Sequence, residues 1–312
     1  MPYYLGIDGG GTKTTCAVGD DSTLLATATA GASNIVRVGE SQARESLRQA
    51  VKQACAAAGI APEQVARVCV GGSGAARPQL AALIREFLAE ILPMPIDVVG
   101  DMQIALEAAF DDGPGVIVIA GTGSIAYGRD LQEKTVRAGG WGFAIGDEGS
   151  AHWIGRSAVS AILRASDLVD ETSAPPSQES LATAVFKAWG VTSLADLARG
   201  ANLIPPPDFA ALFPAVAASQ DDLATQVLTD AGRELARVAA VVMRRLFAKD
   251  ETSSVPVAMT GGVFRHAPRV REVFYNELRA LDPRAEIHPN IVEPVEGALR
   301  MARRAAKESA ET

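Results

Sequence analysis

The sequence predicts an α/β protein with two domains. Its 312 residues are enough for two domains of ordinary size, and 48% of them are hydrophobic, so each domain can hold a core. Short apolar segments alternate with longer amphipathic segments in both halves of the chain. An apolar strand, a turn of Gly and Thr, and a second strand also occur twice, around residues 5–19 and 116–129. We therefore expect two α/β domains of similar construction, separated at the Asp-Asp-Gly-Pro-Gly run of residues 111–115.

The first half has the pattern of a strand meander followed by alternating helices and strands. The predicted strands are residues 3–8, 14–19, 24–30, 67–71 and 96–101, and the predicted helices are residues 39–58, 78–91 and 102–110. Gly59 ends the first helix, in the position where helices commonly end on glycine.

The second half begins with the repeated unit and then becomes mainly helical. The predicted strands are residues 116–120, 125–129 and 255–259, the helices are residues 150–165, 222–247 and 295–306, and the loops are residues 170–177 and 204–208. The helix over residues 222–247 has the clearest pattern, because Leu228, Leu235 and Val242 recur at helical spacing.

Charge and cysteine content exclude several classes of protein. The formal net charge is −8 and the basic residues are scattered, so we expect no nucleic-acid partner. Three cysteines without a Cys-x-x-Cys pair predict buried, reduced thiols and neither a disulfide framework nor a zinc site. The N-terminus lacks the pattern of a signal peptide, and no apolar run reaches membrane-spanning length. We therefore expect a cytoplasmic protein without membrane contact.

Three turns rich in Gly follow apolar strands and could bind phosphate. The first Gly turn is DGGGTKT (residues 8–14), the second is AGTGS (residues 120–124) and the third is MTGGV (residues 259–263). Backbone N–H groups of such turns approach an anion closely, and Lys13 adds a positive charge. One such turn is typical of an ordinary hairpin, but three at strand ends favour a nucleotide site. Since the first turn joins strand to strand and GxxxxGK[ST] is absent, P-loop and dinucleotide motifs are disfavoured.

Two aspartates each end an apolar strand. Ligands of α/β sheets lie at the carboxyl ends of the strands, so Asp8 and Asp101 should face one crevice. Phosphoryl transfer needs neutralised phosphates and a group that accepts the proton of the acceptor hydroxyl. One acid near Mg²⁺ and one near the acceptor would suffice. Asp101 could equally cap the helix that starts at Met102, and both roles can coexist.

The segment GGWGFAIGDEGS (residues 139–150) is the most unusual one in the chain. It combines glycines, two aromatic residues and the adjacent acids Asp147 and Glu148, just before a predicted helix. The helix dipole explains acids at this place, but not the glycines or Trp141. A carboxylate beside exposed backbone is a suitable binder of sugar hydroxyls.

These motifs resemble the N-acetylglucosamine kinase group of the BadF/BadG/BcrA/BcrD ATPase family, within the superfamily of sugar kinases, heat-shock chaperones and actin. The resemblance is carried by LGIDGGGTKT (residues 5–14), Asp101, AGTGS (residues 120–124) and GGWGFAIGDEGSAHWIG (residues 139–155), in the family order. It implies two ribonuclease H-like (actin-like ATPase) domains flanking a nucleotide cleft. Residues 1–113, joined by a C-terminal helix over residues 293–312, would form the first domain, and residues 114–292 the second.

The resemblance also implies a function and a site. The protein would be an ATP-dependent kinase of the 6-hydroxyl of an amino sugar: N-acetylglucosamine, glucosamine or N-acetylmuramic acid. Asp101 would be the catalytic base, and Asp8 would hold Mg²⁺ directly or through water. The sugar would contact Asn34, Ser124, Gly140, Trp141, Gly142 and Asp147. ATP would contact Gly10, Gly11, Thr12, Lys13, Gly121, Thr122, Gly123, Gly261 and Gly262. We also expect a homodimer.

Two departures from the family pattern bear on the alternatives. Ile35 and Val36 follow Asn34 where the animal kinases have His-Trp, which leaves selectivity for the N-acetyl group open. No cysteine follows Cys69, which disfavours the relatives that carry an iron–sulfur cluster and activate other enzymes. An ATPase switch without sugar phosphorylation is the remaining alternative.

Overall fold

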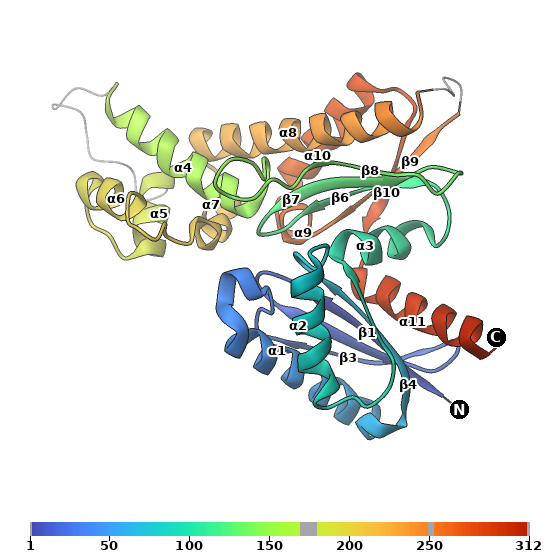
Figure 1. Cartoon of the computed structure of the whole chain (residues 1–312). Helices are drawn as coiled ribbons and strands as arrows, with labels where there is room; N and C mark the ends of the chain where they lie inside the picture. Colours follow the sequence, from blue (N-terminus) through green and yellow to red (C-terminus); the bar gives the residue numbers. More distant parts are fainter. Residues whose placement is uncertain (1, 169–179, 249–252, 311–312) are drawn as a thin grey trace. The chain divides into compact units, whose positions relative to one another are not determined.

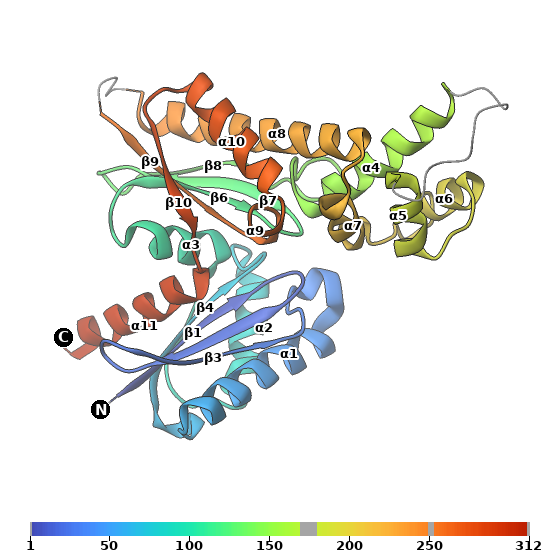
Figure 2. The same cartoon turned by 180° about the vertical axis from the view of Figure 1, so that it is seen from behind.

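The computed structural model describes residues 2–168, 180–248 and 253–310, which form two compact α/β units. The first unit comprises Met1–Gly113 and Val292–Thr312, and the second comprises Pro114–Ile291. Each unit is a five-stranded mixed sheet with helices packed on it (Figures 1 and 2). The expected fold class is therefore confirmed.

The first unit has the strand order β3-β2-β1-β4-β5, antiparallel from β1 to β3 and parallel from β1 through β4 to β5. Its elements are β1 (Tyr3–Gly9), β2 (Thr14–Gly19), β3 (Leu24–Ala30), α1 (Ile35–Ala58), η1 (Pro62–Gln64), β4 (Val65–Gly72), α2 (Pro78–Ala89), β5 (Ile96–Gly100), α3 (Asp101–Phe110) and α11 (Pro294–Ala310). Successive side chains of β1 face opposite sides. Leu5 and Ile7 are buried with residues of α1 and α2, and Tyr4 is buried with residues of α3 and α11.

The helix α11 completes the first unit from the other end of the chain. Two glycines allow its backbone to approach closely: a Cβ at Gly6 would lie 2.6 Å from the carbonyl oxygen of Val295, and a Cβ at Gly297 would lie 2.6 Å from the amide nitrogen of Ala108. Arg303 donates to the carbonyl oxygen of Asp20 at 2.7 Å. One face of the first sheet therefore depends on α11 for its cover.

The second unit has the strand order β10-β9-β6-β7-β8. Its elements are β6 (Gly115–Ala120), β7 (Ser124–Arg129), β8 (Thr135–Gly139), α4 (Ala151–Ser166), α5 (Leu181–Trp189), α6 (Leu194–Ala201), η2 (Phe209–Leu212), α7 (Phe213–Ala218), α8 (Asp222–Leu246), β9 (Val255–Thr260), α9 (Gly262–His266), α10 (Pro268–Leu281) and β10 (Ala285–Ile291). The strands β6, β7 and β8 are antiparallel and β9 and β10 run parallel to β6, so the topology repeats that of the first unit. This confirms the repetition that the sequence indicated.

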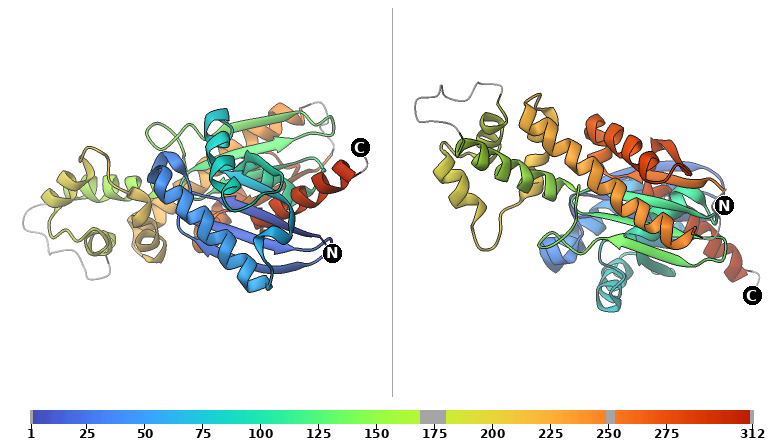
Figure 3. Two further views of the ribbon diagram at one scale, coloured as in Figure 1. Left: turned by 60° about the horizontal axis from the view of Figure 1, so that its bottom comes forward. Right: turned by 90° about the horizontal axis from the view of Figure 1, so that it is seen from above.

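The helices of the second unit form two groups. The helix α8 packs on β7 and β8, and α10 lies along α8 (Figure 2). The helices α5, α6 and α7 gather beside α4 at one end of this sheet (Figures 1 and 3). Among the described residues, no helix is long and apolar enough to cross a membrane.

The predicted elements differ from the observed ones in a few places. The helix α1 begins at Ile35 and not at Gly39, because Asn34 caps it and Gly39, with φ 77°, only interrupts it. The strand expected to end at Asp101 ends at Gly100. Residues 204–208 are a loop, as expected, and the loop expected over residues 170–177 lies outside the described residues. The sequence analysis did not predict β8, α5, α6, α7, α9, α10 or β10.

Candidate functional site

In the first unit, the first Gly turn is tied to the loop before α1. The amide of Gly10 donates to the carbonyl oxygen of Lys13 at 3.0 Å and closes the turn. The amides of Ser33 and Asn34 both donate to the carbonyl oxygen of Gly10, at 3.1 and 3.2 Å. This arrangement places Asn34 beside the predicted phosphate-binding residues. Gly11 is half-buried, and the side chains of Thr12 and Lys13 are exposed.

A hydrogen-bonded chain joins Asn34 to Asp101 through Ser73. The amide nitrogen Nδ2 of Asn34 donates to Oγ of Ser73 at 3.2 Å, and the Ser73 hydroxyl donates to the carboxylate of Asp101. Asp101 also accepts the N–H of Met102 at 2.9 Å. Two predicted site residues that are distant in sequence therefore belong to one network, which we name the Ser73 network (Asn34, Ser73 and Asp101).

Asp101 is the first residue of α3 and not its cap. Gly100 is the N-cap, because its backbone is extended (φ −69°, ψ 147°) while that of Asp101 is already helical. The expectation that Asp101 itself caps the helix is thus wrong, although its carboxylate still accepts an N–H of the first turn.

The carboxylates of Asp8 and Asp101 influence each other. The pKa of Asp8 is raised to about 7, first by burial and then by the negative charge of Asp101, while Lys13 opposes this rise and Glu293 adds to it. Burial also raises the pKa of Asp101, and the N–H of Met102 and the hydroxyl of Ser73 oppose that rise. The two acids thus form a partly desolvated pair in which a proton can be bound near neutral pH.

In the second unit, the second Gly turn is held by the start of α4. The amide of Gly121 donates to the carbonyl oxygen of Gly123 at 2.9 Å. The amides of Ala151 and His152 donate to the carbonyl oxygens of Gly121 and Thr122, at 2.9 and 3.3 Å. The first residues of α4 therefore hold the carbonyl groups of this turn in place.

Asp147 lies between the second Gly turn and the Gly-Trp loop (residues 139–146). It is only 9% exposed and has a left-handed backbone, with φ 59°. Its carboxylate accepts the amide N–H of Gly142 at 3.1 Å and that of Ser124. Burial raises its pKa and these two N–H groups oppose the rise. A Cβ at Gly123 would lie 2.7 Å from Oδ2 of Asp147, so the carboxylate fits against a residue without a side chain.

The sugar-site residues predicted in the second unit besides Asp147 are Ser124, Gly140, Trp141 and Gly142. Ser124 is buried, and its hydroxyl donates to the carbonyl oxygen of Glu148 at 2.7 Å. Gly140 and Gly142 both have positive φ, 69° and 95°, as glycine permits. Trp141 is 67% exposed, and the guanidinium of Arg137 lies 4.7 Å from the centre of its ring. The Gly-Trp loop therefore presents backbone and an aromatic face to solvent.

The third Gly turn packs against the second. Gly261 has φ 107°, and a Cβ on it would clash with the carbonyl group of Ala120 and lie 3.0 Å from the amide nitrogen of Gly121. Gly262 is exposed and begins α9. The two turns predicted to bind ATP in this unit are therefore neighbours.

Ser73 is a residue of this site that was not predicted from the sequence. The signal was present, because Gly71-Gly72-Ser73-Gly74 follows a predicted strand in the same way as the three Gly turns do.

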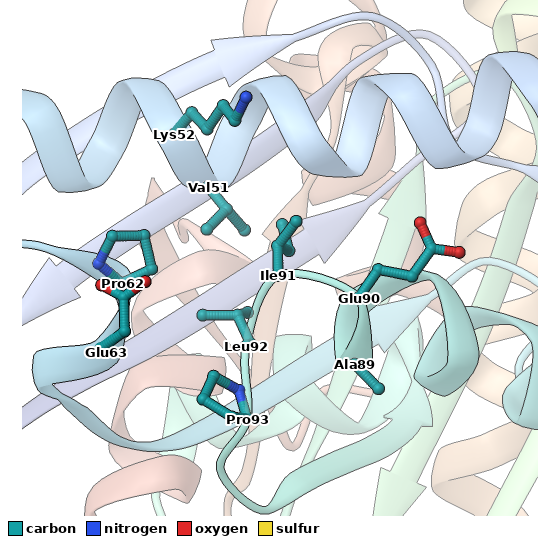
Figure 4. A pocket seen from close by; sticks show the side chains of 9 residues that line it. All are labelled: Val51, Lys52, Pro62, Glu63, Ala89, Glu90, Ile91, Leu92 and Pro93. Carbon is teal, nitrogen blue, oxygen red and sulfur yellow. The ribbon is translucent and has the colours of Figure 1, made fainter.

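A separate hollow in the first unit, of about 420 Å³, contains none of the predicted site residues (Figure 4). It is lined by Val51, Lys52, Pro62, Glu63, Ala89, Glu90, Ile91, Leu92 and Pro93.

Two α/β units with the same strand order, each with a Gly turn after its first strand, define the two-domain fold shared by actin-like ATPases and sugar kinases. Residues 5–302 match the BadF/BadG/BcrA/BcrD ATPase family, and the chain belongs to this family. The expected family is confirmed, and membership implies ATP as the nucleotide.

Three known proteins show what the chain is similar to. It is 37% identical to an N-acetylmuramic acid/N-acetylglucosamine kinase of Clostridium acetobutylicum over 54% of this chain and 55% of the relative. The match with this relative thus spans about half of its length. An N-acetyl-D-glucosamine kinase of Dictyostelium discoideum is 28% identical over 96% of this chain and 97% of the relative. A solved structure from Chromobacterium violaceum, provisionally assigned as an N-acetylglucosamine kinase, is 26% identical and superposes with a TM-score of 0.73, over 96% of this chain and 99% of that one.

Proposed function

We propose that the protein is an ATP-dependent kinase that phosphorylates the 6-hydroxyl of an amino sugar, with Asp101 as general base. The observation that carries this proposal is the Ser73 network, which holds a partly desolvated carboxylate near Asp8 at the carboxyl ends of β1 and β5. The names of the relatives support an amino sugar as the acceptor, N-acetylglucosamine or N-acetylmuramic acid, and the family resemblance adds glucosamine as a candidate.

In the proposed reaction, the carboxylate of Asp101 accepts the proton of the sugar 6-hydroxyl while that oxygen attacks the γ-phosphorus of ATP. The bond from the sugar oxygen to phosphorus forms, the bond to the ADP oxygen breaks, and the proton leaves Asp101 for solvent afterwards. Asn34 can assist sugar binding, since Nδ2 carries a second hydrogen besides the one donated to Ser73.

The phosphates of ATP are assigned to the backbone of the Gly turns. Gly10, Gly11, Thr12 and Lys13 would contact them in the first unit, and Gly121, Thr122 and Gly123 in the second. Gly261 and Gly262 would contact the adenosine. Lys13 supports this assignment, because its exposed ammonium lies close enough to influence Asp8.

Asp8 is the proposed residue for Mg²⁺. Its carboxylate is a hard oxygen donor whose charge is disfavoured by burial and by Asp101, so a divalent cation would be stabilised beside it. When bound, Mg²⁺ would neutralise the phosphates of ATP. Within residues 2–168, 180–248 and 253–310 there is no group of three or more His, Cys, Asp or Glu placed to hold a metal. Magnesium commonly binds through one or two carboxylates together with phosphates and water.

The sugar site is proposed to include Asn34, Ser124, Gly140, Trp141, Gly142 and Asp147. We also propose that the two units act as domains, of residues 1–113 with 293–312 and of residues 114–292. We further propose that the protein is a cytoplasmic homodimer, and light scattering of the purified protein would test the dimer.

The decisive experiment is an ADP-release assay with ATP and Mg²⁺ over glucose, glucosamine, N-acetylglucosamine and N-acetylmuramic acid. We expect at least one amino sugar to stimulate ADP release more than about tenfold and to yield a 6-phosphate by NMR. ADP release that no sugar stimulates would overturn the kinase proposal and favour the ATPase switch.

A further inference from the structure

We infer that Ser73 is a positioning residue, whose hydroxyl fixes the carboxylate of Asp101 for proton acceptance. This inference rests on the proposed function and deepens it. It names a residue outside every motif that suggested the kinase.

The direction of the hydrogen bonds in the Ser73 network is fixed by the start of α1. The oxygen Oδ1 of Asn34 accepts the amides of Val36 and Arg37, at 3.1 and 3.3 Å. The side-chain amide therefore has to turn its nitrogen toward Ser73, and Oγ of Ser73 has to accept. A serine hydroxyl carries only one proton, so that proton is left for the carboxylate of Asp101.

Packing fixes the backbones of both partners. The amide of Ser73 donates to the carbonyl oxygen of Gly9 at 3.0 Å, which ties it to the end of β1. Just before it, Gly71 leaves room for the side chain of Ile104, which a Cβ at this position would strike. Because Ile104 belongs to α3, the helix that carries Asp101 is held directly against β4, the strand that ends just before Ser73.

Three donors then restrain the Asp101 side chain, namely the Ser73 hydroxyl, the N–H of Met102 and the N–H of Asp101 itself. The Met102 donor comes from the neighbouring residue and moves with Asp101. Ser73 is the donor that connects the carboxylate to the sheet, because it lies outside α3. Without it the carboxylate can rotate away from the reactive position, and misplacement by about 1 Å can reduce the rate about a hundredfold.

The test is steady-state kinetics of Ser73 variants with the best amino sugar. Ser73→Ala should lower kcat by about 10- to 100-fold and leave KM for ATP and sugar within about twofold. Ser73→Thr keeps the hydroxyl and should restore most of kcat. Ser73→Cys keeps the size with a weaker donor and should give an intermediate kcat. Ser22→Ala removes an exposed hydroxyl of the same unit and should leave kcat unchanged.

The outcomes separate the two proposals. An active wild-type enzyme with normal kcat in Ser73→Ala or Ser73→Cys would overturn the positioning role and leave the kinase proposal intact. Equal losses in Ser73→Ala and Ser73→Thr would also overturn it, because packing and not the hydroxyl would then be responsible. A wild-type protein inactive on every amino sugar would overturn the proposed function and this inference together. Melting temperatures of all variants show whether each one folds.

Discussion

The first and second Gly turns are built alike but present different chemistry. Both follow the first strand of a five-stranded sheet of the same topology, and both join it to an antiparallel neighbour. Beside the first turn lie Asp8 and Asp101, whose pKa values are raised chiefly by burial. Beside the second lies Asp147, whose carboxylate accepts two backbone N–H groups. We propose proton and charge chemistry for Asp8 and Asp101, and contact with the sugar for Asp147, whose carboxylate also holds the backbone of the Gly-Trp loop.

A repeated fold therefore need not repeat its functional groups. The position of an acid near a Gly turn does not reveal its role; its hydrogen-bond partners do. The comparison can be tested by variants that should affect catalysis in one unit and stability in the other.

The largest effect is expected at Asp101. Asp101→Asn removes the proton acceptor and should lower kcat by about 10³-fold, within the range for loss of a general base. ATP affinity, measured by calorimetry, should change by less than about threefold. Asp97→Asn is the matched control, because Asp97 lies on β5 and pairs with Arg67 away from the network. Near-normal turnover in Asp101→Asn would remove this residue from the proposed role.

At Asp147 we expect a loss of stability. Asp147→Ala leaves two backbone N–H groups without their acceptor and places alanine at φ 59°, so the free energy of unfolding should fall by about 3 kcal/mol. Asp147→Asn keeps an acceptor oxygen and tolerates the left-handed backbone, and should cost about 1 kcal/mol. Urea denaturation measures both values. If both substitutions had the same small effect, Asp147 would not hold the Gly-Trp loop.

The two glycines of the second turn should differ from each other. A Cβ at Gly123 would lie 2.7 Å from Asp147, whereas a Cβ at Gly121 would meet nothing within 4 Å. Gly123→Ala should therefore lower the free energy of unfolding by about 2 kcal/mol, and Gly121→Ala should change it little. Thermal unfolding of the two variants side by side is sufficient. If the two variants were equally stable, the side chain of Asp147 could move away from a Cβ at position 123 without loss of stability.

The smallest effect concerns Asp8 and how the free energy of unfolding depends on pH. The pKa of Asp8 is raised to about 7 in the folded protein, above that of an unfolded aspartate. The folded state therefore binds more protons between pH 4 and 7, and stability falls as pH rises through this window. Asp8→Asn should be more stable than wild type by about 1–2 kcal/mol at pH 8 without Mg²⁺, and no more stable at pH 4. Glu40→Gln, at an exposed acid, is the matched control. An advantage at pH 4 equal to that at pH 8 would contradict the raised pKa.

Most of the central sheet strands could be predicted from the sequence, but the edge strands of the second unit could not. The central strand β6 is a continuous apolar run followed by Gly121, and β1 is mostly apolar up to Asp8 and Gly9, which is a strong signal. The edge strand β8 has no buried residue, and β10 is more than half exposed and contains Pro289, so their sequences lack the usual pattern. By contrast, α10 could have been predicted, since Val270, Val273, Phe274 and Leu278 recur at helical spacing after Pro268.

The candidate site, like the fold, could be predicted only in part. Strand ends located Asp8 and Asp101, because the carboxyl ends of parallel strands meet at one edge of a sheet. The role of Ser73 could not be predicted, since it depends on how the Asn34 amide is oriented by the start of α1. The left-handed backbone of Asp147 was also hidden, because the adjacent acids fitted a helix start equally well.

The position of α11 has a consequence for synthesis on the ribosome. Residues 1–113 emerge first, yet Tyr4, Cys69 and Ile104 share their buried cluster with Leu299 and its neighbours in α11. At ~5–20 residues per second, translation of residues 114–291 takes on the order of ten to thirty seconds. Throughout that interval the nascent first sheet carries an uncovered apolar face. We expect the growing chain to need protection by a chaperone until its last helix leaves the exit tunnel.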